Sequence, residues 1–176
     1  MSEKPISLEI MRKAFALLDE KLNHPGRLIM GGGGAMIFAH AFPLATTDVD
    51  AIAKGIEIPE LERLTKEIAQ EMNLPPDWLN CYFSTFAYVV LPDFERHLIE
   101  VFSGRHLKVL CLSREDMLIM KCFAHRPKDV SHAKALLKAG VDLKKVENHL
   151  EFLRAKKIGE AQKAVDFLDD LLDQIE

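Results

Sequence analysis

The chain has 176 residues, of which 48 % are hydrophobic and 28 % charged, and this composition is typical of one globular core with a small helical appendage. Its formal net charge of −4 argues against a generally basic nucleic-acid binder, although a local basic groove remains open. Three widely spaced cysteines without a C-x-x-C pattern argue against a disulfide framework or a cysteine zinc site. The sequence shows neither a signal-peptide pattern nor an apolar run of eighteen residues. We therefore expect a cytoplasmic protein without membrane contact.

Hydrophobic periodicity and breaker residues define the elements of the first half of the chain. Ser7 is a typical helix cap, the Asn-His-Pro-Gly run at 23–26 ends that helix, and Pro59 suits the first turn of another. We interpret Trp78, the single tryptophan, as a packing anchor. The pattern predicts helices over 7–22, 35–40 and 59–72 and strands over 27–30 and 49–53.

The second half changes from strand-like to helical patterns. Aromatic and β-branched residues over 81–91 and 96–102, separated by Pro92 and Asp93, predict a hairpin, and 107–112 predicts a short last strand. After Ser113 the pattern predicts helices over about 114–125, 128–139, 142–155 and 158–175. The prediction is an α+β fold: a small mixed or antiparallel sheet flanked by helices over 1–112, followed by a C-terminal helical region over 113–176.

Residues 28 to 53, LIMGGGGAMIFAHAFPLATTDVDAIA, contain the strongest functional signal. Glycines that follow a strand and open a helix let backbone N–H groups approach a phosphate closely. Asp48 and Asp50 lie one residue apart at the start of the next predicted strand, so their side chains share a face and Val49 points into the core. Paired carboxylates need a cation, and Mg²⁺ takes such hard oxygen ligands together with substrate phosphate. The combination indicates nucleotide chemistry.

This segment resembles the nucleotidyltransferase superfamily of DNA polymerase beta, whose signature is h-G-[GS], nine to thirteen residues, and D-h-[DE]-h. Gly34 is followed here by thirteen residues and then by Asp48-Val49-Asp50. The run of four glycines leaves a register open that begins at Met30. The resemblance implies an NTP substrate, a Mg²⁺ or Mn²⁺ ion, and the following nucleotide-contacting residues: Gly33, Gly34, Thr46 and Thr47.

Two-metal phosphoryl transfer needs a third carboxylate near the first two. Glu100 is our candidate, because it interrupts the apolar run LIEVF, where a buried unpaired charge would be costly. With this assignment the metal ligands are Asp48, Asp50 and Glu100, and we expect Glu100 on a strand next to the pair. The alternative interpretation places Glu100 on the polar face of an edge strand.

Lys121 interrupts the apolar run from Met117 to Phe123 of a predicted helix, and Arg126 and Lys128 follow at its end. One interpretation is a cationic cluster that offsets the charge of the triphosphate, with Lys121 as a catalytic residue. Lys121→Met would then weaken triphosphate binding and leave the melting temperature unchanged. A surface lysine would change neither property, and a lysine buried against a carboxylate such as Asp129 would lose stability on substitution.

The same segment extends the resemblance to bacterial nucleotidyltransferase-like proteins of the abortive-infection toxin group. Their K-x-x-A-x-R-x-K-D pattern is matched by residues 121 to 129, and the D-W-L-N segment at 77–80 is similar to one uncharacterised branch. Relatives often carry R-x-T-x-D-h-D, whereas Leu44 stands at the arginine position. The resemblance implies a setting in a toxin–antitoxin pair.

Three functional hypotheses follow from the sequence. The first is a nucleotidyltransferase that transfers a nucleoside monophosphate to a hydroxyl group of RNA, protein or a small molecule. The second is a catalytically degenerate binding or regulatory module similar to an antitoxin. The third is a structural protein that docks a partner protein or a second copy through its C-terminal helices, since residues 163–175 carry an apolar stripe. Metal-dependent nucleotide binding separates the first from the others.

Overall fold

The computed structural model describes residues 5–41, 46–82 and 87–175. Backbone contacts divide the chain into two compact units, and the first is discontinuous along the sequence. It comprises residues 1–85 and 98–112, and the second comprises residues 86–97 and 113–176. Each unit is considered by itself below.

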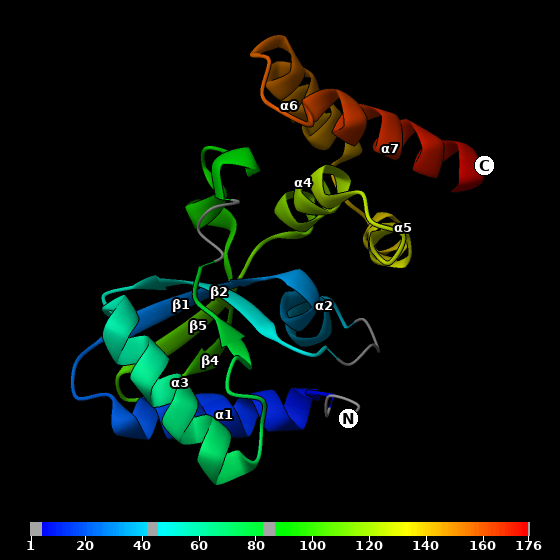
Figure 1. Cartoon of the computed structure of the whole chain (residues 1–176). Helices are drawn as coiled ribbons and strands as arrows, with labels where there is room; N and C mark the ends of the chain where they lie inside the picture. Colours follow the sequence, from blue (N-terminus) through cyan, green and yellow to red (C-terminus); the bar gives the residue numbers. More distant parts are fainter. Residues whose placement is uncertain (1–4, 42–45, 83–86, 176) are drawn as a thin grey trace. The chain divides into compact units, whose positions relative to one another are not determined.

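The first unit contains three helices and a five-stranded mixed sheet in its described part (Figure 1). Its elements are α1 (Leu8–Lys21), β1 (Gly26–Gly31), α2 (Gly32–His40), β2 (Val49–Lys54), α3 (Ile58–Met72), β3 (Leu79–Asn80), β4 (Ile99–Ser103) and β5 (Leu107–Cys111). The strand order is β3-β2-β1-β5-β4, with β1 antiparallel to β2 and parallel to β5. The predicted α+β fold class is therefore confirmed.

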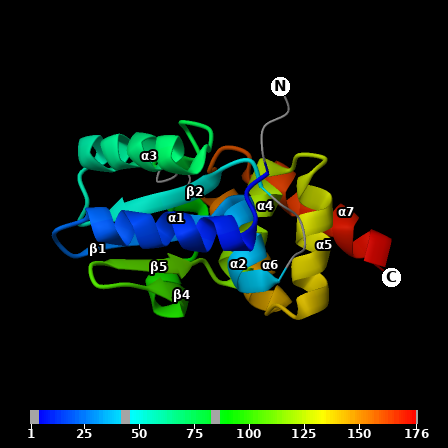
Figure 2. The ribbon, with the colours of Figure 1, turned by 90° about the horizontal axis from the view of Figure 1, so that it is seen from below.

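Helices α1 and α3 cover one face of this sheet (Figures 1 and 2). Phe15 of α1 is fully buried at the centre of the contact, with ring centroids 6.1 Å from Phe38, 6.4 Å from Trp78 and 6.1 Å from Phe102. These rings come from four separate parts of the chain, so one aromatic side chain of α1 joins α2, the start of β3 and β4 in a single core. Aromatic rings at such distances contribute packing energy beyond area burial.

Alternation along the strands places the charged residues on the other face of the sheet. On β1, Leu28 is fully buried while Arg27 is exposed, and on β5, Val109 is fully buried while Lys108 is exposed. Asp50 and Lys54 of β2 also share this face, because their positions differ by four, an even number. The polar face therefore carries Asp50 near one end of the strands and a group of basic residues near the other.

Trp78 anchors the short strand β3 against β2. Its indole is fully buried and its Nε1 donates a hydrogen bond of 3.0 Å to the carbonyl of Thr65 in α3. Its own carbonyl accepts a hydrogen bond of 2.7 Å from the N–H of Val49. The predicted role of Trp78 as a packing anchor is confirmed, and the anchor sets the register in which Asn80 pairs with Asp50.

The predicted hairpin between residues 81–91 and 96–102 is wrong in the described part of the chain. Strand β4 pairs with β5, and the described residues 87–89 form a short 3₁₀ turn; residues 83–86 lie outside the described residues. The physical reason is tertiary. Val89 and Leu91 are buried in the second unit, where the carbonyl of Val89 lies 2.8 Å from Nε2 of His149 and the N–H of Leu91 donates to Asp116.

The second unit is helical in its described part. Its elements are the 3₁₀ helix η2 (Phe94–His97) and the helices α4 (Arg114–Ala124), α5 (Asp129–Ala139), α6 (Leu143–Ala155) and α7 (Ala161–Ile175). Asp116 is fully buried in α4, where it accepts hydrogen bonds from Leu91 N–H at 2.8 Å and from Ser113 Oγ at 2.9 Å. Burial raises the pKa of this carboxyl, and the two donors oppose that rise.

The apolar stripe of α7 is partly used within the unit. Leu168 and Leu171 are buried, whereas Ile175 is about half exposed. Docking of a partner through the C-terminal helices therefore stays a prediction, with a smaller apolar surface than the sequence alone indicates. Among the described residues, no helix has the length and apolar character needed to cross a membrane.

Candidate nucleotide site at the glycine turn

The glycine run forms a tight junction between β1 and α2. Gly31 caps the helix in an extended conformation, and Gly32, the first helical residue, has φ +62°, which favours glycine. A Cβ atom at Gly32 would overlap Oδ2 of Asp50. The backbone N–H groups of Gly32, Gly33 and Gly34 lie in the first turn of α2, where intrahelical acceptors are missing. A phosphate fits such a helix N-terminus, because its charge complements the helix dipole.

Gly33 and Gly34 differ in what surrounds them. A Cβ at Gly33 would lie 2.9 Å from Oγ1 of Thr46, so this glycine permits close approach of the segment that precedes β2. Gly34 is buried, and a Cβ there would lie 2.8 Å from Cε of Met30. Gly34 therefore allows close packing of α2 on the sheet, in addition to its predicted contact with nucleotide. The glycine whose Cβ position meets the Asp50 carboxylate is Gly32.

Thr46 and Val49 fix the entry of the chain into β2. The Thr46 hydroxyl donates a hydrogen bond of 2.8 Å to the carbonyl of Asp48, and Thr46 also forms a bridge with Ile6. Val49 is fully buried, as the alternation of the D-h-D motif predicts. Thr47 is exposed. Thr46 therefore acts on the backbone of Asp48, and its predicted contact with nucleotide stays a prediction.

Asp50 lies between the glycine turn and β3. Its Oδ2 faces Gly32, and its Oδ1 accepts a hydrogen bond of 2.9 Å from Nδ2 of Asn80. Asn80 is itself oriented, because its Oδ1 accepts a hydrogen bond of 3.1 Å from the N–H of Tyr82. The hydroxyl of Tyr82 in turn donates to Oε1 of Glu62 in α3. The carboxylate of Asp50 is thus oriented by a hydrogen bond to Oδ1, while Oδ2 lies close to Gly32.

Asn80 is the site residue that our sequence analysis missed. It lies directly opposite Asp50 in the parallel pairing of β2 with β3. The sequence shows the D-W-L-N segment at 77–80 as a motif. The contact of its last residue with Asp50 follows only from the pairing of β3 with β2. Leu44, where relatives often carry arginine, lies outside the described residues.

The prediction that Glu100 lies on a strand next to the aspartate pair is wrong. Glu100 belongs to β4, which is separated from β2 by β1 and β5, and it is exposed. Among the described residues, no three side chains of histidine, cysteine, aspartate or glutamate come together in a way that could hold a metal ion. The nearest cation to Glu100 is Lys108, at 3.9 Å between Oε2 and Nζ. Glu100 therefore matches the alternative interpretation, a residue on the polar face of an edge strand.

Lys121 forms a buried ion pair within the helical unit. Its Nζ lies 3.1 Å from Oδ1 of Asp129, and the two side chains are 6 % and 0 % exposed. Burial lowers the pKa of Lys121, and the Asp129 charge opposes this shift. Burial tends to raise the pKa of Asp129, but hydrogen bonds and charges from Arg126 and Lys121 bring it below its usual value. This is the third of the three roles that the sequence left open for Lys121.

Arg126 and Lys128 flank the same carboxylate in different ways. Arg126 donates to Asp129 through its backbone N–H at 3.1 Å, through Nε at 2.7 Å and through Nη2 at 3.2 Å. Lys128 is exposed at the residue before α5. The structure thus provides a carboxylate partner for Lys121 and Arg126, and the predicted contacts of Lys121, Arg126 and Lys128 with phosphate stay predictions.

The fold and the motif together define a nucleotidyltransferase-like protein: a mixed sheet, a glycine turn at a helix N-terminus, and a D-h-D pair at the start of the adjacent antiparallel strand. Residues 7–172 match the model of the family described as nucleotidyltransferase of unknown function (DUF6036), and the chain belongs to this family. No curated protein and no solved structure showed a significant match to the chain.

Proposed function

We propose that this protein is a metal-dependent nucleotidyltransferase that transfers a nucleoside monophosphate from an NTP to a hydroxyl acceptor. The observation that supports this most directly is the position of Asp50, whose two carboxylate oxygens face the glycine turn and Asn80. Phosphates at the N-terminus of α2 would then lie beside this carboxylate. Membership of a nucleotidyltransferase family supports the same proposal.

The donor set suits one hard divalent cation. Asp48 and Asp50 offer carboxylate oxygens, and Mg²⁺ commonly binds one or two carboxylates together with substrate phosphate. A bound Mg²⁺ or Mn²⁺ would supply charge neutralisation on the phosphates. Asn80 contributes its amide N–H to Asp50, which keeps the orientation of that carboxylate fixed. Such outer hydrogen bonds typically tune metal affinity and ligand orientation.

The proposed reaction is an in-line displacement at the α-phosphorus of the NTP. The acceptor oxygen forms a bond to the α-phosphorus, the bond from this phosphorus to the bridging oxygen breaks, and pyrophosphate leaves. One carboxylate of the D-h-D pair takes the proton of the acceptor hydroxyl. The N–H groups of the first turn of α2 hold the phosphates in place, so positioning and electrostatic stabilisation provide most of the catalysis.

Calorimetry of ATP binding with and without Mg²⁺ tests the nucleotide site. We expect the metal to strengthen binding, and Asp48→Asn and Asp50→Asn each to abolish that increase, since removal of a ligand should exceed the ~10–100-fold loss typical of an outer partner. Asp77→Asn is the matched control, because Asp77 is an exposed acid of the D-W-L-N segment. Equal affinity of the wild type with and without metal would contradict the proposal.

Transfer of label from an α-labelled NTP to components of a cell extract tests the reaction and identifies the acceptor class. We expect a labelled product with the wild type and none with Asp50→Asn. The resemblance to the abortive-infection toxin group motivates a companion experiment on a toxin–antitoxin setting, in which growth arrest on expression of the wild type should disappear with the same variant.

One observation favours a second function, a catalytically degenerate binding or regulatory protein. Asn80 is the residue directly opposite Asp50, and no third carboxylate joins the aspartate pair in the described part of the chain. A protein of this second kind binds nucleotide in calorimetry and transfers no label. The two experiments together therefore separate the hypotheses.

A further inference from the structure

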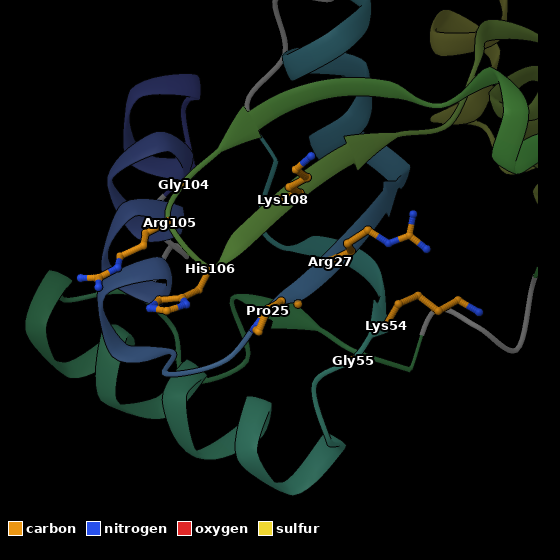
Figure 3. Close-up of a pocket in the computed structure, with 9 residues that line it drawn as sticks. Pro25, Arg27, Lys54, Gly55, Gly104, Arg105, His106 and Lys108 are labelled. Atoms are coloured by element: carbon orange, nitrogen blue, oxygen red, sulfur yellow. The ribbon is translucent and has the colours of Figure 1, made fainter.

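Three basic residues form a row across the sheet, at the end of the strands remote from Asp50. Arg27 of β1 lies directly opposite Lys54 of β2 in the antiparallel pairing, and directly opposite Lys108 of β5 in the parallel pairing. Because cross-strand partners share a face, the three side chains leave the same face of the sheet. Figure 3 shows them on three adjacent strands, and all three residues are exposed.

This arrangement is unfavourable for the free protein. Like charges directly opposite each other on neighbouring strands are destabilising. Within the described residues, neither Arg27 nor Lys54 has a carboxylate within ion-pair distance, and Lys108 approaches only Glu100, at 3.9 Å. A chain with a formal net charge of −4 thus concentrates three positive charges in one line, with a single, distant carboxylate partner among the described residues. An anionic ligand would relieve the repulsion.

The row borders a hollow of about 520 Å³, and the turn between β4 and β5 lines the same hollow. This turn carries Arg105 and His106, and both residues line the hollow. Asp19 of α1 holds the turn in place, since its carboxylate accepts hydrogen bonds from the N–H groups of Arg105 at 3.0 Å and of His106 and Leu107 at 2.7 Å each. The basic surface is therefore built on anchored backbone.

We propose that the row Arg27–Lys54–Lys108 binds the phosphate backbone of a single-stranded nucleic acid. Neighbouring strands are about 4.8 Å apart, so the row extends over roughly 10 Å. One phosphate needs donors that converge on a point, whereas charges in a line suit consecutive phosphates of a chain. Both residue types suit phosphate, because lysine binds it as a point charge and arginine matches it with a planar fork.

The row and Asp50 lie on the same sheet face, and Lys54 is four positions after Asp50 along β2, which corresponds to about 13 Å. Lys54 is the member of the row that shares a strand with Asp50. The proposed site for the phosphate backbone does not depend on the proposed nucleotidyltransferase function, because it requires only the positive charges of the row. Positively charged grooves that follow a backbone are the usual basis of binding to single strands.

Fluorescence anisotropy with a labelled single-stranded oligonucleotide of about 12 nucleotides tests the site across a salt series. We expect R27Q/K54Q/K108Q to lose about 10- to 30-fold in affinity at low salt and to reduce the slope of log K against log salt by about 2, the value for three lost contacts. R96Q/K66Q/K138Q removes the same charge from exposed positions outside the row and should bind like the wild type. RNA and DNA oligonucleotides of one sequence distinguish the two sugars.

Equal losses with both triple variants would overturn the proposal, since they would indicate a general charge effect, and so would a wild type without binding. A polyglutamate peptide or phosphatidylserine vesicles that bind more tightly than the oligonucleotide, with the same dependence on the row, would also overturn it. If the triple variant melts abnormally, K54Q and K108Q alone should each reduce the slope by about 0.7. Asp50→Asn should keep oligonucleotide binding, so failure of the proposed catalysis and failure of this site are distinguishable.

Discussion

Two groups of basic residues in this protein contrast in how their charge is balanced. In the helical unit, Lys121 and Arg126 surround the fully buried carboxylate of Asp129. In the sheet unit, Arg27 and Lys54 face each other in register, with no carboxylate at ion-pair distance in the described part of the chain. The first group has the arrangement of a structural ion pair. The second has exposed like charges side by side, an arrangement that an anionic ligand would stabilise.

The difference shows why charge type alone does not identify a functional residue. A buried ion pair is costly to break, because removal of one partner leaves a desolvated charge behind. A row of like charges costs stability while it is intact, and functional sites commonly reduce stability in this way. Substitution should therefore lower the stability in the first group and leave it unchanged or slightly higher in the second.

Lys121→Met gives the largest effect on stability that we expect. The substitution keeps the apolar stem but removes the cation from Asp129, so we expect a loss of about 3 kcal/mol, at the lower end of the usual cost because Arg126 still contacts the carboxylate. This corresponds to a decrease in melting temperature of about 6–12 °C for a chain of this size. Differential scanning calorimetry measures it.

Lys128→Met is the control for that substitution, because Lys128 is exposed in the same segment and should change the stability by less than about 0.5 kcal/mol. A normal melt of Lys121→Met with weaker ATP binding would instead restore the interpretation that Lys121 meets the triphosphate. R27Q/K54Q/K108Q should melt at or slightly above the wild-type temperature, which would sharpen the contrast between the two groups.

The elements with local signals could be predicted from the sequence. Helix α1 and strand β2 are within a residue or two of their predicted bounds, because periodicity, caps and breakers act over short distances. The failure at 81–91 has the opposite cause. Val89 and Leu91 have strand-like side chains, but contacts with α4 and α6 in another part of the chain determine their conformation.

The candidate site shows the same limit. Asp50 and the glycine turn could be predicted from the sequence, because D-h-D and the glycine run are local motifs. Asn80 and the row Arg27–Lys54–Lys108 depend on pairing between strands distant in sequence, and no spacing rule reveals them. The prediction for Glu100 failed for the same reason. The sequence shows an acidic residue among apolar ones, but only the order of the strands shows how far β4 lies from β2.

His132 of α5 allows a test of the Lys121–Asp129 group through pH. Burial first, and then the charge of Lys121, lowers the pKa of His132 to about 4. The unfolded chain binds the proton near pH 6.5, so stability is fully present above this pH and decreases as the pH falls from 6.5 to 4. Because solvent partly screens these charges, we expect the free energy of unfolding to decrease by about 1–2 kcal/mol over this pH range.

Melting temperatures at a series of pH values measure the His132 contribution as the difference between the wild type and His132→Gln. We expect the difference to be constant above pH 6.5 and to move in favour of the variant as the pH falls toward 4. The variant serves as its own control for other titrating groups, because Asp129 and Asp116 are retained in both proteins. A pH-independent difference would show that His132 titrates normally and is not affected by the Lys121 charge.

Glu100→Gln gives the smallest effect and separates the two ends of the sheet. Its side chain is 50 % exposed and 3.9 Å from Lys108, so removal of the charge should change the stability by less than about 0.5 kcal/mol. Mg²⁺-dependent ATP binding should stay as in the wild type, because β1 and β5 separate Glu100 from Asp50. Oligonucleotide binding should tighten by about twofold, since Lys108 loses a competing carboxylate near the row. Loss of the metal effect in this variant would return Glu100 to the metal site, and weaker oligonucleotide binding would argue against the row as a phosphate site.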